Sequence, residues 1–395
     1  MRSNGLNPHP QPMPLTRRVL LQRGGVLVVG SAIAPLIAAC GGDDSSSSAA
    51  SQGTPSGKPT GRIDFMSWQG YDAPDAMAPF KKRTGVTLKA TYMGNHDEIQ
   101  TKILAAHGTK SLDMITYSQG YQPLYENLKI LTPIDEDRLK NLGNLFDFFA
   151  GDYKNFWLTK DGTRIGVPFN WGYVAMSYDT AKIDQPATYD DLLDPKFKGK
   201  IGIPEDLIGV AQLAAHAVDV DITQMDDAAF DKVKVFLTAM VGQTKGVSPT
   251  YGDLATRFAE GAIEAAFCGW APIDQLAADG GNKNVKTVLP ESGGVGYCDA
   301  LAIPPTADNP DAVYAWIDET LVPETAAKIL ESLGTATPVE PAVPLLPKAL
   351  QDAYPYDDID AFIAKAPMYA LPPFESDQYV TWPQVVEAWQ EIKGA

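Results

Sequence analysis

The sequence predicts an α/β fold of about two domains, with sheets covered by helices. From residue 62 onward, short apolar runs alternate with stretches whose apolar residues recur at helical spacing. The 395 residues are 45% hydrophobic and 21% charged, which is the composition of a globular protein with a large core. Without an amino-terminal segment of roughly 60 residues, about 335 residues remain, more than one core usually holds.

The first elements follow from local patterns. Residues 62–68 alternate in polarity as a half-buried strand does. Residues 75–84 place Phe80 and the stems of two lysines at helical spacing, and Gly85 is a typical C-cap. Residues 86–92 then predict a second strand.

Residues 98–107 predict a second helix, with Ile99, Ile103 and Leu104 on one face. Apolar runs predict further strands at residues 113–117, 164–178 and 297–304.

The amino-terminal segment predicts an export signal. Arg17 and Arg18 precede an uncharged stretch, residues 24–39, that is too short to span a membrane comfortably, as in twin-arginine signals. The stretch ends in the sequence AACG, similar to a bacterial lipobox, in which cleavage precedes the cysteine and the thiol carries a lipid. We therefore expect residues 1–39 to be removed and Cys40 to be lipidated. The alternative, a transmembrane anchor or buried helix, is disfavoured by the combination of arginine pair, length and cysteine.

Residues 40–61 predict a flexible tether, because serine, glycine and proline dominate and almost nothing can pack. Twenty residues of such coil reach roughly 25 Å, so a lipid-held domain would stand off the membrane but stay near a partner embedded in it.

Two cysteines, Cys268 and Cys298, remain besides the lipidated one. An oxidising compartment would permit a disulfide between them. Export of an already folded protein from a reducing cytosol favours two free buried thiols instead.

The chain is strongly acidic, with a formal charge of −17. Removal of the signal, which holds four arginines and no acid, leaves 28 basic and 49 acidic residues, a charge of −21. This field repels nucleic acid and attracts cations, so we expect no nucleic-acid partner.

Motifs of catalysis are lacking in the sequence, which has no phosphate-binding loop, zinc-protease motif, nucleophile elbow or paired CxxC. The histidines of the mature chain, His96, His107 and His216, have no metal-ligand spacing. His96 with Asp97 and Glu98 could ligate a metal, but a solvated helix start is the favoured interpretation. We expect no enzyme activity, no cofactor and no metal.

Aromatic residues beside acids or small polar residues at strand ends indicate a site for an organic cation. A ring face attracts a desolvated ammonium, and a carboxylate accepts its N–H bonds. For any one of these residues alone, ordinary packing is the commoner explanation. The groups lie at residues 67–72, 117–118, 169–171, 205–206, 269–274 and 297–299.

The order of these groups resembles the spermidine/putrescine-binding proteins of bacterial ABC importers, along almost the whole chain from Arg62 to Ala395. The DALAIP run is the most specific, whereas the DPKFKGK run is shared by wider groups of solute-binding proteins. The matching runs are SW at 67–68 with Tyr71, FKKRTGV at 80–86, LTPID at 131–135, GVPFNWG at 166–172, LDPKFKGK at 193–200, GW at 269–270 and DALAIP at 299–304.

The resemblance implies ligand contacts from two lobes. On the first, Trp68 matches an aromatic wall, Tyr71 an amine-contacting phenol and Ser118 a small polar contact. Gln69, between the two aromatics, is included as a candidate contact. Asp299 keeps the family's central carboxylate.

The second-lobe positions match less evenly. Asp206 matches one carboxylate, but the position that is acidic in spermidine-type members is Gly209 here. Trp270 fits the putrescine-type members, and Asp274 is a candidate for their nearby acid with the register shifted by one. Tyr297 replaces the usual tryptophan.

The implied architecture is the two-lobed type II periplasmic binding protein fold, with the ligand cleft between the lobes. Residues 62–168 and 299–334 would form lobe 1, and residues 169–298 and 335–395 lobe 2. Hinge closure around the ligand is the expected motion.

The implied function is capture of a polyamine, with a putrescine-like diamine favoured over spermidine because Gly209 removes one acid. The ligand would pass to a membrane permease and ATPase complex. We expect a monomeric, lipid-anchored protein of the periplasm or cell envelope. The alternatives are a receptor of this fold for another small cationic or polar metabolite, and an exported non-transport protein that uses the fold.

Overall fold

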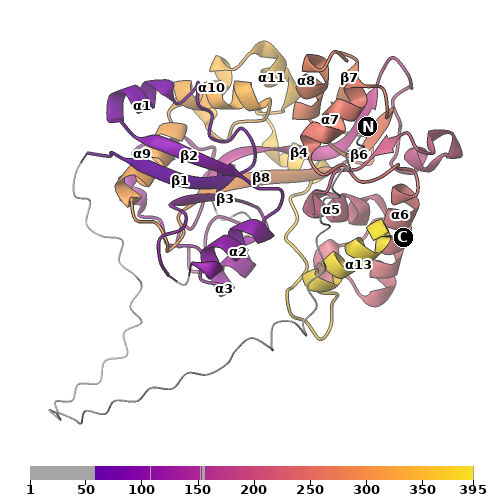
Figure 1. Cartoon of the computed structure of the whole chain (residues 1–395), viewed down its shortest axis with the longest axis horizontal. Helices are drawn as coiled ribbons and strands as arrows, with labels where there is room; N and C mark the ends of the chain where they lie inside the picture. Colours follow the sequence, from indigo (N-terminus) through magenta and orange to yellow (C-terminus); the bar gives the residue numbers. More distant parts are fainter. Residues whose placement is uncertain (1–57, 107, 152, 154–155, 395) are drawn as a thin grey trace, which may run out of the picture. The chain divides into compact units, whose positions relative to one another are not determined.

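The computed structural model describes residues 58–106, 108–151, 153 and 156–394. Across these residues, eight strands form one sheet in the order β2-β1-β3-β8-β4-β6-β5, with β7 paired to β4 (Figure 1). The expected signal peptide, Cys40 and most of the tether lie outside the described residues.

The strands are β1 (Arg62–Ser67), β2 (Thr87–Tyr92), β3 (Met114–Ser118), β4 (Val167–Asp179), β5 (Ile201–Gly202), β6 (Ala265–Trp270), β7 (Val285–Val288) and β8 (Val295–Ala302). The α-helices are α1 (Ala78–Thr84), α2 (Asp97–Ala105), α3 (Gln122–Asn127), α4 (Asp147–Ala150), α5 (Leu207–Ala217), α6 (Asp227–Val241), α7 (Tyr251–Ala259), α8 (Pro272–Asp279), α9 (Pro310–Thr320), α10 (Pro323–Leu333), α11 (Lys348–Ala353), α12 (Ile359–Lys365) and α13 (Trp382–Gly394).

Both faces of the sheet are covered around β1 and β3, because side chains alternate between faces along each strand. Ile63, Phe65 and Met114 pack in a core with helices α1, α9 and α10. Met66 and Ile115 pack in another core with α2 and α3. Strands β1 and β3 are therefore apolar on both faces, as is typical of strands buried between helix layers.

The strands β4 and β8 form the centre of the sheet. β4 pairs with β8 from Val167 to Val174 and then with β6 and β7. The pairing of β4 with β6 shifts by one residue at Cys268, whose φ of 61° is uncommon for a residue other than glycine. Cys268 is thus the extra residue of a bulge, which bends β6 where it approaches Trp270.

The expected local elements are largely confirmed. Helix α1 ends at Gly85 with φ 78°, and Phe80 is buried. Helix α2 buries Ile99 and Ile103, whereas Leu104, expected on the same face, is 45% exposed. A residue directly after Ile103 lies about 100° further round the helix, which carries its side chain away from the core.

The core also bears on the expected lobes. Val339 and Ala342 follow the expected crossing after Gly334, yet they pack in the same hydrophobic cluster as β1, α9 and α10. A separate small cluster joins α7, α8 and β7. The boundaries of 62–168 with 299–334, and of 169–298 with 335–395, stay a prediction.

Cys268 and Cys298 are both buried free thiols, the alternative that export of a folded protein favours. None of the helices in the described ranges combines the length and the apolar composition that a membrane crossing requires.

Candidate ligand-binding site

Three polar side chains form a row across the centre of the sheet. Asp299 of β8 pairs with Ser118 of β3 on one side and with Asn170 of β4 on the other. Residues paired across antiparallel strands point to the same face. Ser118, Asp299 and Asn170 therefore lie side by side, and all three are buried.

Hydrogen bonds hold this row in place. The Ser118 hydroxyl donates to Oδ1 of Asp299 at 2.5 Å, and the Tyr71 hydroxyl donates to Oδ2. The Asn170 amide Nδ2 donates in turn to the Tyr71 oxygen at 2.8 Å. Each carboxylate oxygen of Asp299 thus has one protein donor, which leaves capacity for further N–H donors.

Asp299 is costly to ionise where it lies. Burial raises its pKa to about 6, the hydrogen bonds from Ser118 and Tyr71 oppose this rise, and the negative charge of Asp206 adds to it. Among the described residues, no lysine or arginine forms an ion pair with Asp299 or Asp206. The two carboxylates thus interact without a protein cation between them.

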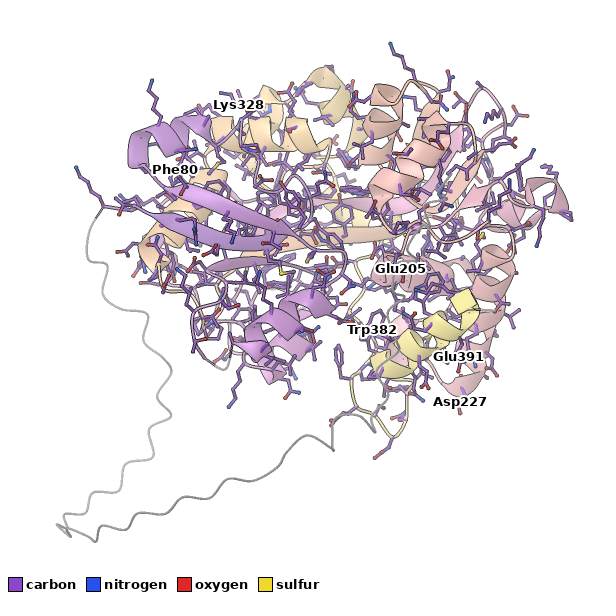
Figure 2. The ribbon with its side chains drawn as sticks, viewed as in Figure 1. Phe80, Glu205, Asp227, Lys328, Trp382 and Glu391 are labelled. Atoms are coloured by element: carbon purple, nitrogen blue, oxygen red, sulfur yellow. The ribbon has the colours of Figure 1, made fainter. Side chains whose placement is uncertain are left out.

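Asp206 is held at the start of α5. Its carboxylate accepts the Gly209 N–H at 3.4 Å as the helix N-cap, and it accepts the Tyr251 hydroxyl at 2.8 Å. Burial raises its pKa. The preceding residue, Glu205, pairs instead with Lys393 on α13, the helix that carries Trp382 and Glu391 (Figure 2). Lys393, the cation at this helix start, therefore pairs with Glu205 and not with Asp206.

Gly209 packs closely against Asp206, so there is no free space for a side chain at position 209. A Cβ built on Gly209 would be 2.8 Å from Oδ2 of Asp206 and 2.8 Å from Sγ of Cys268. Both distances are too short for a real Cβ, so a longer side chain here would displace the Asp206 carboxylate or the thiol. The close packing of Asp206 and Cys268 around Gly209 therefore leaves no room for the acid that spermidine-type members have at this position.

Trp270, the last residue of β6, and Tyr297, near the start of β8, are joined by a hydrogen bond. The indole N–H of Trp270 donates to the Tyr297 hydroxyl at 2.7 Å, and the Trp270 ring centre lies 5.2 Å from that of Tyr251. Gly172 of β4 has no side chain facing Tyr297, and a Cβ there would lie within 3 Å of the phenol ring. Trp270, Tyr297 and Tyr251 are all half-buried.

Trp68, at the end of β1, is half-buried and packs edge-on against His96 at 5.4 Å. His96 stacks on Tyr121 at 4.2 Å, and its Nε2 accepts the Ser118 backbone N–H. Burial lowers the pKa of His96 to about 3, so the imidazole is neutral. The expectation of a solvated helix start was therefore wrong at His96, because stacking and the Ser118 bond bury it.

The remaining two candidates do not join this network. Gln69 is exposed. Asp274 accepts the backbone N–H of Thr287 at 3.1 Å and its hydroxyl at 2.8 Å, so its carboxylate ties α8 to β7. No group of metal-ligating side chains occurs in the described part of the chain.

Sequence reasoning missed three residues of the site, Asn170, Tyr251 and Tyr121. Asn170 was noticed only as a neighbour of two aromatic residues, although a polar residue inside an apolar run is itself a usable signal. Tyr251 follows Thr250 at the start of a helix and carried no comparable signal, and nor did Tyr121.

Comparison with known proteins assigns the family. Residues 75–356 match the family model described as bacterial extracellular solute-binding protein. The chain belongs to this family. The match includes Ser118, Asp206 and Asp299, whereas Trp68 and Tyr71 precede it.

The curated relatives have low sequence identity to this solute-binding protein, but the matches cover most of each chain. The spermidine/putrescine-binding periplasmic protein of Escherichia coli is 26% identical over 304 residues, which cover 75% of this chain and 83% of the relative. The putrescine/cadaverine-binding protein of Pseudomonas aeruginosa is 26% identical over 303 residues, covering 72% and 81%.

A solved structure confirms the fold of this solute-binding protein. The putative spermidine/putrescine ABC transporter protein from Listeria monocytogenes superposes with a TM-score of 0.72 at 23% identity, covering 84% of this chain and 98% of that one. The type II periplasmic binding protein fold expected from the sequence is thereby confirmed. At this level of identity the structural likeness speaks for the fold alone.

Proposed function

We propose that the protein is the substrate-binding component of an ABC importer and that it captures a small organic dication. One observation carries this proposal: burial and the charge of Asp206 raise the pKa of Asp299, burial raises that of Asp206, and no cation of the described chain pairs with either carboxylate. A ligand ammonium would supply the missing charge and stabilise both ionised forms. The names of the relatives in Escherichia coli and Pseudomonas aeruginosa, which refer to spermidine, putrescine and cadaverine, support the same ligand class.

The groups on hand suffice for useful affinity. Micromolar binding needs about 8 kcal/mol. A hydrogen bond to a charged group contributes roughly 1.5–3 kcal/mol, and a desolvated cation–π contact contributes about 2 kcal/mol. Two carboxylates, Asp299 and Asp206, together with ring contacts to the ligand from Trp68, Trp270 and Tyr297, would therefore account for a micromolar complex.

Two carboxylates match two ammonium groups, so we expect a putrescine-like diamine to bind better than spermidine. A third ammonium in a closed site would lack a dedicated partner and would cost several kcal/mol. Gly209 offers no acid, and its packing against Asp206 and Cys268 leaves no room for one.

In the cell, the protein would be exported and held at the membrane through a lipid on Cys40. Closure of two lobes around the diamine would create the form that the permease and ATPase complex recognises. This role needs binding and release only, so we assign no catalytic step to the protein.

Calorimetric titration of the purified mature chain with putrescine, cadaverine and spermidine at matched ionic strength tests the proposal. We expect saturable binding of the diamines at one site and weaker binding of spermidine. Absence of binding by every amine, with binding of a neutral metabolite instead, would contradict it.

A further inference from the structure

We propose that Asn170 is a specificity-determining residue, which requires the cationic end group of the ligand to carry at least two N–H bonds. This inference rests on the proposed function, because it concerns the same site. It predicts that primary and secondary amines are accepted and that tertiary and quaternary ammonium groups are discriminated against.

The first observation is an unpaired acceptor. Asn170 is 0% exposed, and its Oδ1 has no hydrogen-bond partner, whereas its Nδ2 donates to Tyr71. Leaving a buried acceptor unpaired costs free energy, and Asn170 lies beside Asp299, where a ligand that binds this carboxylate can supply the missing donor.

The orientation of this amide follows from its neighbours. The Tyr71 hydroxyl has one proton, and that proton is donated to Asp299. Toward Asn170 the Tyr71 oxygen can therefore only accept, so the NH₂ group of Asn170 must face it. This assignment leaves the Asn170 carbonyl oxygen as the group that awaits a donor.

The position of Asn170 makes the ligand the natural donor. Asn170 and Asp299 are paired across β4 and β8, and neighbouring strands lie about 4.8 Å apart. An ammonium that donates one N–H to Asp299 is then within reach of Asn170 with a second N–H. Asp299 retains acceptor capacity for this, since Ser118 and Tyr71 occupy one site on each of its oxygens.

The charge alone would not discriminate in this way. A quaternary ammonium still interacts with the Asp299 charge and with aromatic faces. It has no N–H, however, and would leave the carbonyl oxygen of Asn170 buried and unpaired. Asn170 therefore converts a site for any organic cation into a site for N–H donors.

A methylation series provides the test. Putrescine has three N–H bonds at each ammonium, and symmetric mono-, di- and trimethylation of both nitrogens leaves two, one and none. In the unaltered protein we expect the dissociation constant to rise at least tenfold between the monomethyl and dimethyl compounds, when the second N–H is lost. In Asn170→Leu, which keeps the volume and removes the acceptor, we expect this step to move to the change from dimethyl to trimethyl.

The position of the step separates the proposal from crowding by methyl groups, which would act in both proteins alike. Thr116→Val is the matched control, because Thr116 of β3 is also fully buried with an unpartnered oxygen. In Thr116→Val the dissociation constant should still rise between the monomethyl and dimethyl compounds, as in the unaltered protein. A smooth decline in the unaltered protein, or the same step in Asn170→Leu, would overturn the role of Asn170 while leaving the proposed function standing.

If Asn170→Leu does not fold, Asn170→Ala serves in its place, with circular dichroism as the check on folding. The series in the unaltered protein can overturn the proposal without any variant, because binding without a step already contradicts it. Failure of putrescine itself to bind would overturn the proposed function, and this inference with it.

Discussion

Tyr71 and Asp299 are 228 positions apart in the sequence, and the hydroxyl of one donates a hydrogen bond to the carboxylate of the other. Burial and the nearby charge of Asp299 raise the pKa of Tyr71, so the phenol keeps its proton and remains a donor. This bond links the loop after β1 to the middle of β8. The central carboxylate is therefore preorganised by protein donors before a ligand arrives, which reduces the ordering that binding requires.

Replacement of Asp299 by asparagine should weaken putrescine binding by about 2–5 kcal/mol, because the ligand ammonium would be desolvated without its partner charge. Asp64→Asn is the control, since the Asp64 side chain pairs with the exposed Arg62 on β1. Calorimetry on both variants measures the difference. Equal losses in the two variants would mean that the site lies elsewhere.

Affinity for putrescine should fall as the pH drops below about 6. Burial holds the pKa of Asp299 near 6 in the free protein, and the cation binds the ionised form, so below that pH binding must expel a proton. The dissociation constant should then rise by up to tenfold per pH unit, and it should be nearly constant from pH 7 to 8.

Other groups near Asp299 allow this dependence to be assigned. The pKa of Asp206 is also raised by burial and contributes in the same direction, whereas that of His96 is lowered to about 3 and the imidazole stays neutral throughout. Titrations at several pH values with Asp299→Asn should show a much smaller slope below pH 6. An unchanged slope in this variant would assign the effect to Asp206 or another acid.

Local patterns in the sequence predicted most of the fold, because strand alternation, helical spacing and a glycine C-cap depend on neighbours only. Trp68, Tyr71, Ser118, Asp206 and Asp299 could be proposed as site residues since they are aromatic, acidic or small polar residues that match family positions. What their side chains contact depends on distant residues. Asp274, which looked like a ligand contact, is bound to Thr287, and the partner of Asp206 is Tyr251, 45 positions further on.

Export should depend on the twin-arginine pair. Changing both Arg17 and Arg18 to lysine should leave precursor in the cytoplasm, because that signal is read through its arginines. Fractionation of cells followed by immunoblotting would measure this. Normal appearance of mature protein in the envelope would contradict the prediction.

Lipid attachment should depend on Cys40, because the lipid needs a thiol at that position. Cys40→Ser should move the protein from the detergent phase to the aqueous phase in a partitioning experiment. Cys298→Ser is the control, since Cys298 is a buried free thiol. Unchanged partitioning of Cys40→Ser would rule out the lipid anchor.

Substitution of Gly209 should destabilise the protein and disturb the site together. A Cβ at position 209 would press on the Asp206 carboxylate and on the Cys268 thiol, each 2.8 Å away, and overpacking of this kind typically costs about 1–3 kcal/mol. We expect Gly209→Ala to lower the free energy of unfolding by that amount and to weaken diamine binding, because Asp206 must move from its place at the start of α5.

Gly252→Ala is the matched control, since Gly252 lies in the first turn of α7 and a Cβ there meets nothing closer than 3.6 Å. Alanine should be neutral or stabilising at that position, by up to about 1 kcal/mol. Urea denaturation and calorimetry on the two variants measure both effects. If Gly209→Glu instead folded normally and bound spermidine better than putrescine, this outcome would contradict the prediction. The packing around Asp206 would then have room for an acid at position 209.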